Sequence, residues 1–163
     1  MVELIVVIVL IGIIGTVAVG RFMDNTPFTS AAWTDQVRSM LRYGQKLAIA
    51  QNRPVFVLLQ NDRIALCFSA NAACPLPQRV PASGGANSGA GTSVKLCGGS
   101  GWMCEAVPAA LAMTVPATHI AFDALGRAST PNGAAPRLGV KAKDADDADA
   151  ATIAVENETG YVD

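Results

Sequence analysis

The sequence predicts an α+β fold in which a long N-terminal hydrophobic helix is packed, through an amphipathic continuation, on a C-terminal antiparallel β-sheet domain. Three features of the 163 residues lead to this prediction. They are a charge-free apolar segment at 4–20, apolar residues at helical spacing over 28–52, and short apolar segments separated by turns after residue 52. A helical region followed by a series of strands is typical of an α+β domain. We therefore expect two parts, a hydrophobic helix over 1–28 and a globular head over 29–163.

Composition restricts the classes of function. Hydrophobic residues make up 51% of the chain and charged residues 15%, which excludes a disordered, solvated chain. A net charge of −1 gives no overall attraction to nucleic acid. The chain has a single histidine and contains neither a G-x-S-x-G sequence nor a phosphate-binding loop. We therefore expect no enzymatic activity, no cofactor, no bound metal and no small-molecule substrate.

The N-terminal segment has the properties of a membrane helix. Residues 4–20 (LIVVIVLIGIIGTVAVG) are 17 consecutive uncharged residues. As a helix they would span about 26 Å, close to the roughly 30 Å of a bilayer core. A cleavable signal peptide is the alternative, but the acid Glu3 rather than a basic residue precedes the segment, and no A-x-A site follows it. We expect insertion in a membrane.

Glu3 requires an explanation, because a carboxylate beside an apolar span is costly unless it is paired, protonated or able to reach the interface. Either it reaches the lipid headgroups or another chain supplies its cation. The segment MVELIVVIVLIGIIG resembles the N-terminus of type IV pilins and type II secretion pseudopilins. The resemblance implies that Glu3 pairs with the amino terminus of a neighbouring subunit during filament assembly. The segments 122–129 (FDALGRAS) and 152–162 (TIAVENETGYV) resemble the FimT/GspH-like branch of that family.

The family's mature chains usually begin with a Phe two residues before the position of Met1, after a basic leader. Either Met1 is an internal start and the mature chain is about two residues longer, which we favour, or the chemistry of the N-terminus is unusual. The basic residues that follow the span would place the body in the cytoplasm under the positive-inside rule. An upstream basic leader would instead allow a periplasmic body.

Three glycines, Gly12, Gly15 and Gly20, interrupt the apolar segment. Related filaments lose helicity in a similar region, so the resemblance implies that this stretch partly unwinds in a packed filament. Close packing of small residues between helices is the alternative. The sequence alone favours neither unwinding nor close packing.

The head is predicted from turns and apolar segments. Residues 54–60 and 64–68 form a hairpin around a polar turn at 61–63. Residues 69–101, rich in Ala, Gly, Ser and Pro, are expected to be loop with one brief strand. Besides the hairpin, the strands are expected at 94–97, 118–123, 138–141 and 152–156.

Four cysteines, Cys67, Cys74, Cys97 and Cys104, form two C-x6-C pairs. Structural zinc ligands are usually two to four residues apart, so we expect disulfides rather than metal binding. Three connectivities are possible. We favour the local pairing of each C-x6-C, with the nested pairing Cys67–Cys104 and Cys74–Cys97 left open. Disulfides place the head in an oxidising compartment.

Charge is distributed unevenly along the head. Arg38, Arg42 and Lys46 are four residues apart on one helix face, and 144–163 contains seven acids and no base. These groups are either solvated or make contacts between stacked subunits. The acids considered for such contacts are Asp144, Asp146, Asp147 and Asp149. Their pattern departs from a calcium-binding loop, so we expect a polar surface loop there.

DNA binding is the remaining alternative suggested by the resemblance, because some FimT-like pilins bind DNA through a Gly-Arg-x-Arg motif. Here Gly126-Arg127-Ala128-Ser129 keeps the first arginine and lacks the second, so we do not expect DNA binding. We expect a structural subunit of a type IV pilus-like filament that assembles with other pilins. It would be a single-pass inner-membrane protein with its body in the periplasm before assembly, and part of an extracellular filament afterwards. The alternative is a minor pilin or pseudopilin at the tip of a pilus or secretion pseudopilus, with adhesin function possible there.

Overall fold

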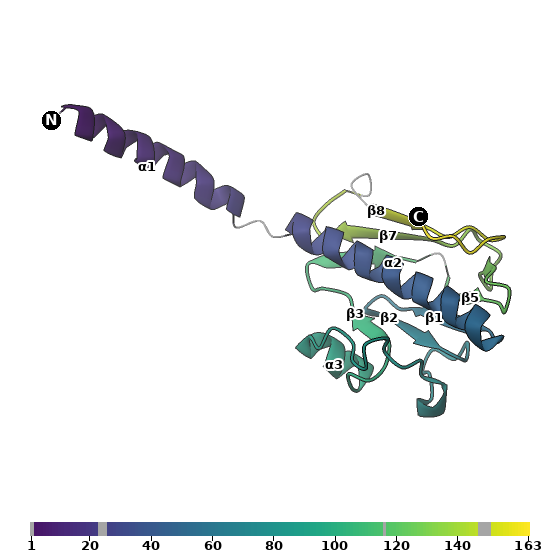
Figure 1. Cartoon of the computed structure of the whole chain (residues 1–163). Helices are drawn as coiled ribbons and strands as arrows, with labels where there is room; N and C mark the ends of the chain where they lie inside the picture. The colour runs from purple at the N-terminus through teal and green to yellow at the C-terminus, as the bar shows by residue number, and fades with distance from the viewer. Residues whose placement is uncertain (1, 23–25, 116, 147–150) are drawn as a thin grey trace.

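The chain begins with two long helices. The computed structural model describes residues 2–22, 26–115, 117–146 and 151–163, and does not describe the side chains of residues 14–26. The helices are α1 (Val2–Phe22) and α2 (Thr26–Gln51). Figure 1 shows α2 lying across the strands of the head. The amphipathic helix expected over 28–52 is therefore present and begins two residues earlier.

The larger sheet has five strands in the order β3-β2-β1-β5-β6, and every neighbouring pair is antiparallel. The hairpin predicted over 54–68 is confirmed, with Leu59 opposite Ile64 next to the turn. The strand predicted at 118–123 is also present, as β5. The five strands are β1 (Val55–Leu59), β2 (Arg63–Cys67), β3 (Cys104–Ala106), β5 (His119–Phe122) and β6 (Ala128–Ser129).

A second, three-stranded sheet follows the order β4-β7-β8. Its strands are β4 (Leu111–Thr114), β7 (Arg137–Ala142) and β8 (Ala151–Ala154). Buried Leu138, Val140 and Ile153 alternate with more exposed neighbours, as in a sheet with one face on the core. The strands predicted at 138–141 and 152–156 correspond to β7 and β8. The single sheet of the prediction is thus corrected to two sheets, and β3, β4 and β6 were not anticipated.

The face of α2 that covers the sheets contains most of the apolar residues noted in the sequence. Leu47 is half-buried against the same core, and Gly44 permits close packing, since a Cβ there would lie 3.2 Å from Leu66 Cδ2. The helix therefore sits closely on β1 and β2. The buried members of the face are Trp33, Val37, Met40, Leu41 and Ala48.

Strands β1 and β2 are covered on both faces. Val55 and Val57 belong to the core shared with α2, whereas Leu58 and Ala65 belong to a second cluster that contains Trp102 and all four cysteines. A strand buried on both sides is apolar at nearly every position rather than at alternate ones. This accounts for the uninterrupted apolar sequence VFVLL of β1.

The middle of the chain contains more regular structure than the sequence suggested. One such element is the short 3-10 helix η1 (Leu76–Gln78). The prediction of a strand at 94–97 is wrong, because residues 94–97 form the C-terminal half of the helix α3 (Gly91–Cys97). The helix places Ser93 and Cys97, four residues apart, on one buried face against β3. A segment of four residues, three of them apolar, is too short for its spacing to distinguish a strand from a helical turn.

Candidate functional site

The described part of α1 presents a continuous apolar surface. The large apolar side chains between Val2 and Ile13 are each 48–76% exposed. Glu3 is exposed in the first turn, where a carboxylate interacts favourably with the helix dipole. Soluble monomers rarely expose so large an apolar surface. This surface therefore has the character of one that another molecule or a lipid phase covers.

A search of the described residues for a helix long and apolar enough to cross a membrane finds none. The membrane helix stays a prediction.

Gly12, Gly15 and Gly20 all lie within α1 and are helical. Among the described atoms, a Cβ at Gly12 would meet nothing within 4 Å. Both interpretations of the glycines, unwinding and close helix packing, therefore concern contacts outside the single chain.

Two of the three basic residues on α2 bind the C-terminal segment of the same chain. Arg38 Nε donates to the carbonyl oxygen of Asp163 at 2.9 Å, and Arg42 Nη2 donates to that of Val162 at 3.0 Å. Arg38 Nη1 also pairs with Asp35 at 3.1 Å. Arg38 and Arg42 therefore bind the chain's own C-terminal segment and are not simply solvated, while contacts of this helix face between subunits stay a prediction.

The other charges assigned to contacts between subunits remain at the surface where they are described. Lys46 is exposed, as are Asp144 and Asp146. Asp147 and Asp149 lie outside the described residues. Within the part of the chain that the structure describes, no group of three or more His, Cys, Asp or Glu side chains is placed to hold a metal ion.

The four cysteines form two disulfides, each of which closes a short loop. Cys67 is bonded to Cys74 and Cys97 to Cys104, so each C-x6-C pair closes on itself. This is the local pairing that the sequence analysis favours. On the chain-entropy model, each short loop contributes about 2.4 kcal/mol to stability. We call residues 67–105, which contain both bridges, the cross-linked region.

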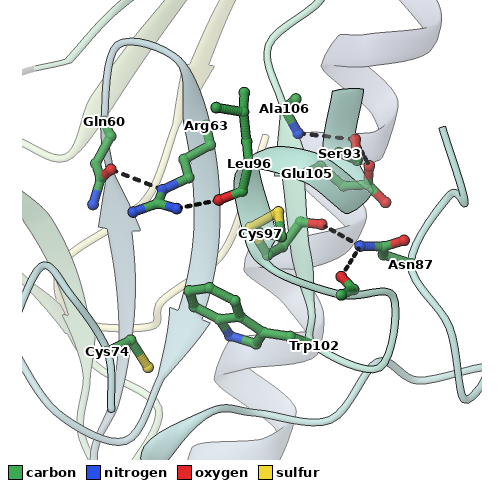
Figure 2. Close-up of a disulfide and its surroundings, with 12 residues drawn as sticks. Gln60, Arg63, Cys74, Asn87, Ser93, Leu96, Cys97, Trp102, Glu105 and Ala106 are labelled. Carbon is green, nitrogen blue, oxygen red and sulfur yellow. Dashed lines mark hydrogen bonds between the residues drawn. A yellow bond between two sulfur atoms is a disulfide. The ribbon is translucent and has the colours of Figure 1, made fainter. Parts of the chain in front are cut away.

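A buried carboxylate organises this region. Glu105, on β3, is 3% exposed. It accepts hydrogen bonds from the backbone N–H of Ser88 (2.5 Å) and from the hydroxyls of Ser88 (2.6 Å) and Ser93 (2.8 Å). Ser93 Oγ in turn accepts the backbone N–H of Ala106 at 3.0 Å. Figure 2 shows Ser93 with Glu105 and Ala106 near the disulfide of Cys97. Three hydrogen bonds from neutral donors to the carboxylate, and a fourth to Ser93 Oγ, thus connect the Ser-rich loop and α3 to the sheet edge.

Trp102 belongs to the same region and has two arginines near its ring, of which Figure 2 shows Arg63. Its indole Nε1 donates to the Leu66 carbonyl at 2.7 Å. The guanidinium of Arg79 lies over the ring at 4.3 Å from its centroid, and that of Arg63 is 6.0 Å away. Beside Arg79 is a surface hollow of about 310 Å³, which we call the Arg79 hollow; its lining includes Leu76, Pro81, Gly98 and Gly101.

Arg127 of the partial DNA-binding motif is engaged within its own turn. Its Nε pairs with Asp123 at 3.0 Å, and the same carboxylate accepts the backbone N–H groups of Leu125 and Arg127. Desolvation raises the pKa of Asp123, but these hydrogen bonds and the Arg127 charge outweigh it and hold the pKa below its ordinary value. Gly126 has a φ of +82°, so the turn itself requires a glycine there. Gly126 and Arg127, the two residues of the motif that this chain keeps, therefore both have a structural role in the turn.

His119, the single histidine, is the first residue of β5. Its ring meets Phe56 of β1 edge to face, with centroids 5.4 Å apart. Partial burial lowers its pKa. The environment is that of a sheet-face side chain.

Taken together, the two long helices followed by two antiparallel sheets define an α+β fold. Among solved structures, the chain is similar to the crystal structure of the type IV minor pilin FimU from Pseudomonas aeruginosa strain PAO1. The TM-score is 0.52 over 86% of this chain and 87% of that one, with 13% sequence identity. The likeness shows a shared fold. No family model matches the chain. No curated protein matches it either.

Sequence reasoning missed Glu105, Arg79 and Trp102. One signal was present: Lys95 and Glu105 are the sole charged residues between Arg79 and His119. An acid in a segment with so few charges is a candidate for a carboxylate that the fold must supply with hydrogen-bond donors. The partners of that carboxylate could not be named from the sequence, because the serines that bind it lie 12 and 17 residues away.

Proposed function

We propose that this chain is a structural, non-enzymatic subunit of a type IV pilus-like extracellular filament and polymerises with other pilins through α1. The observation that carries the proposal is the exposed apolar surface of α1 from Val2 to Ile13. The pilin-type fold of the head supports it. Before assembly we place α1 in the inner membrane and the head in the periplasm, where the two disulfides would be stable.

The size of the apolar surface is adequate for assembly. Complete burial of a Val, Leu or Ile side chain contributes about 1.5–3 kcal/mol. The side chains on α1 are roughly half covered already, so the ten from Val2 to Ile13 would contribute about 1 kcal/mol each, or about 10 kcal/mol, on packing among neighbouring helices. Association costs about 4–15 kcal/mol in lost freedom. Contacts with several neighbours can therefore offset that cost.

Glu3 would set the register of the helices within such a bundle. A carboxylate transferred to an apolar core needs a cation to offset its desolvation, and the amino terminus of a neighbouring subunit would supply one. In the single chain Glu3 is exposed and so available to a partner. Gly12, Gly15 and Gly20 would then allow either close contact between helices or local unwinding in the shielded interior.

The proposal is tested by Glu3→Gln in the host that carries the chain and its assembly machinery. Glu158→Gln, an exposed acid of the head, is the matched control. Sheared filaments are quantified by immunoblot and electron microscopy, with total cellular protein measured in parallel. We expect Glu3→Gln to reduce filament yield at least about tenfold, in line with loss of a buried charge pair, and Glu158→Gln to leave it unchanged. Equal yields from both variants would overturn the role of Glu3, and no filaments from the unaltered chain would overturn the proposal.

A second role, as a minor pilin or pseudopilin that initiates or caps the filament, is favoured by one observation. The solved structure with a similar fold is that of a protein named as a minor pilin. Copy number separates the two roles. Quantitative mass spectrometry of sheared filaments would find this chain as the main component if it is the building block, and as a trace beside another pilin if it has the minor role.

A further inference from the structure

We propose that the Arg79 hollow binds an acidic sugar, with the sugar carboxylate held by the guanidinium of Arg79. The hollow lies between the two disulfide-closed loops, at the edge of the head. This inference does not depend on the filament role of α1, because no residue of the helix takes part.

The guanidinium of Arg79 is fixed in position before any ligand arrives. It stacks on Trp102, and Trp102 is itself anchored through its hydrogen bond to Leu66. Nε and Nη1 make long hydrogen bonds to the carbonyls of Cys74 (3.4 Å) and Cys97 (3.3 Å). Among the described residues Nη2 has no hydrogen-bond partner. A preorganised guanidinium with one open edge binds carboxylates at low entropic cost.

The approach to this edge is open because the neighbouring residues are glycines. Gly98 ends α3 in the left-handed conformation, with φ +67°. A Cβ at this position would lie 3.9 Å from both terminal nitrogens of Arg79. At Gly101 a Cβ would meet no described atom within 4 Å. Any larger side chain along this rim would therefore narrow the path to the cation.

The charge of the hollow selects an anion. Among the described residues that line it, Arg79 is the charged one, and no carboxylate is present. Arg63 adds a second positive charge near Trp102. Glu105 is close in sequence to Trp102 of the hollow, but its carboxylate accepts hydrogen bonds from Ser88 and Ser93 instead. An incoming carboxylate therefore meets a cation without competition from an acid of the hollow.

The shape of the hollow favours a sugar ring over a bare anion. Its volume of about 310 Å³ is at the lower end of small-molecule sites. Leu76 is 76% exposed beside Arg79, and Pro81 is exposed on the same rim. A pyranose ring can place its C–H face against these apolar groups while its carboxylate reaches the guanidinium. A uronic acid unit combines both features.

The experiment is an NMR titration of the full chain in detergent micelles, observing the Trp102 indole and Arg79 Nε–H signals. The probes are methyl β-D-glucuronide, its neutral analogue methyl β-D-glucoside, and N-acetyl-aspartate, which carries carboxylates without a sugar ring. We expect saturable shifts with the glucuronide and an affinity at least about tenfold higher than for the other two, since a charge-assisted bidentate contact is lost with the glucoside. Unmoved signals would overturn the site. Equal binding of N-acetyl-aspartate would overturn the sugar assignment.

Two variants test the position of the ligand. Gly101→Leu should fill the hollow and reduce the affinity for the glucuronide at least about tenfold while leaving Arg79 intact. Gly84→Leu is the matched control, because Gly84 also has open space around it and lies outside the hollow; it should bind as the unaltered chain does. Arg79→Lys keeps the charge but loses the planar, two-pronged donor, and should also weaken binding. Undiminished binding by Gly101→Leu would contradict the proposal.

Discussion

Glu105 provides the sharpest test of how the cross-linked region is held together. Its Oε2 accepts both serine hydroxyls, from Ser88 and Ser93, while Oε1 accepts the backbone N–H of Ser88. Glu105→Gln keeps the shape of the side chain. Its amide oxygen can replace Oε2, but its NH2 group then faces the backbone N–H of Ser88, so two donors oppose each other. Glu105→Ala removes all three acceptor contacts.

The expected cost depends on which donors water can reach. A hydrogen bond to a charged group contributes about 1.5–3 kcal/mol, and an unpaired buried donor costs about 1–3 kcal/mol. Ser88 is exposed and can bond to water, whereas Ser93 is 2% exposed and cannot. We therefore expect the free energy of unfolding to fall by about 2 kcal/mol in Glu105→Gln and by about 3 kcal/mol in Glu105→Ala.

The assay is urea unfolding of the full chain in detergent micelles, followed by tryptophan fluorescence, with Glu158→Gln as the exposed control. The double variant Glu105→Gln with Ser93→Ala measures the coupling between the two side chains. We expect a coupling energy above about 0.5 kcal/mol, because residues in one network are not additive. If Glu105→Gln were as stable as Glu158→Gln, the carboxylate would not organise this region and the reasoning would be refuted.

Two further predictions concern the sheets. Gly160 has φ +63°, and a Cβ there would overlap the carbonyl oxygen of Gly126, whereas Gly133 has φ +69° and open space. In urea unfolding, Gly160→Ala should therefore be at least about 2 kcal/mol less stable than Gly133→Ala, which reports backbone strain alone; equal stabilities would contradict the contact. Burial lowers the pKa of His119 from its ordinary 6.5, so below that pH the unfolded chain binds more protons and stability falls as the pH drops. His119→Gln should flatten the stability profile between pH 7 and pH 5, and an unchanged slope would exclude this origin.

Much of the secondary structure could be predicted because its signals are local. The helical spacing of Trp33, Val37 and Leu41 identified the buried face of α2. The apolar segments around a polar turn identified the β1–β2 hairpin. The division into two sheets could not be predicted, since it depends on pairing between strands that are far apart in the sequence. The strands β3 and β6 could not be predicted either, because they are only two or three residues long and form where a longer strand pairs with them. Short strands carry too little periodicity to be read from sequence.

The site residues were harder to predict, for a different physical reason. Basic residues four apart on a helix suggest a solvated face, yet Arg38 and Arg42 donate to carbonyls 120 or more residues away. Backbone carbonyls are present at every residue, so the sequence does not indicate which of them will be acceptors. The same applies to Arg79, which was not singled out in the sequence. Its importance comes from Trp102 and two cysteine carbonyls that the disulfide-closed loops bring beside it.

The core of the head is separate from the described apolar surface of α1. The buried cluster begins at Trp33 and, among the described residues, includes no side chain of α1. The C-terminal segment closes the same core from the other end, through Val155 and Val162. Because the buried core of the head uses none of the apolar surface from Val2 to Ile13, the transfer of α1 from lipid to neighbouring helices that we propose would not require the head to unfold. Substitutions in this part of α1 should therefore alter assembly and leave the urea unfolding of the head unchanged; a parallel loss of both would show that the head depends on the helix.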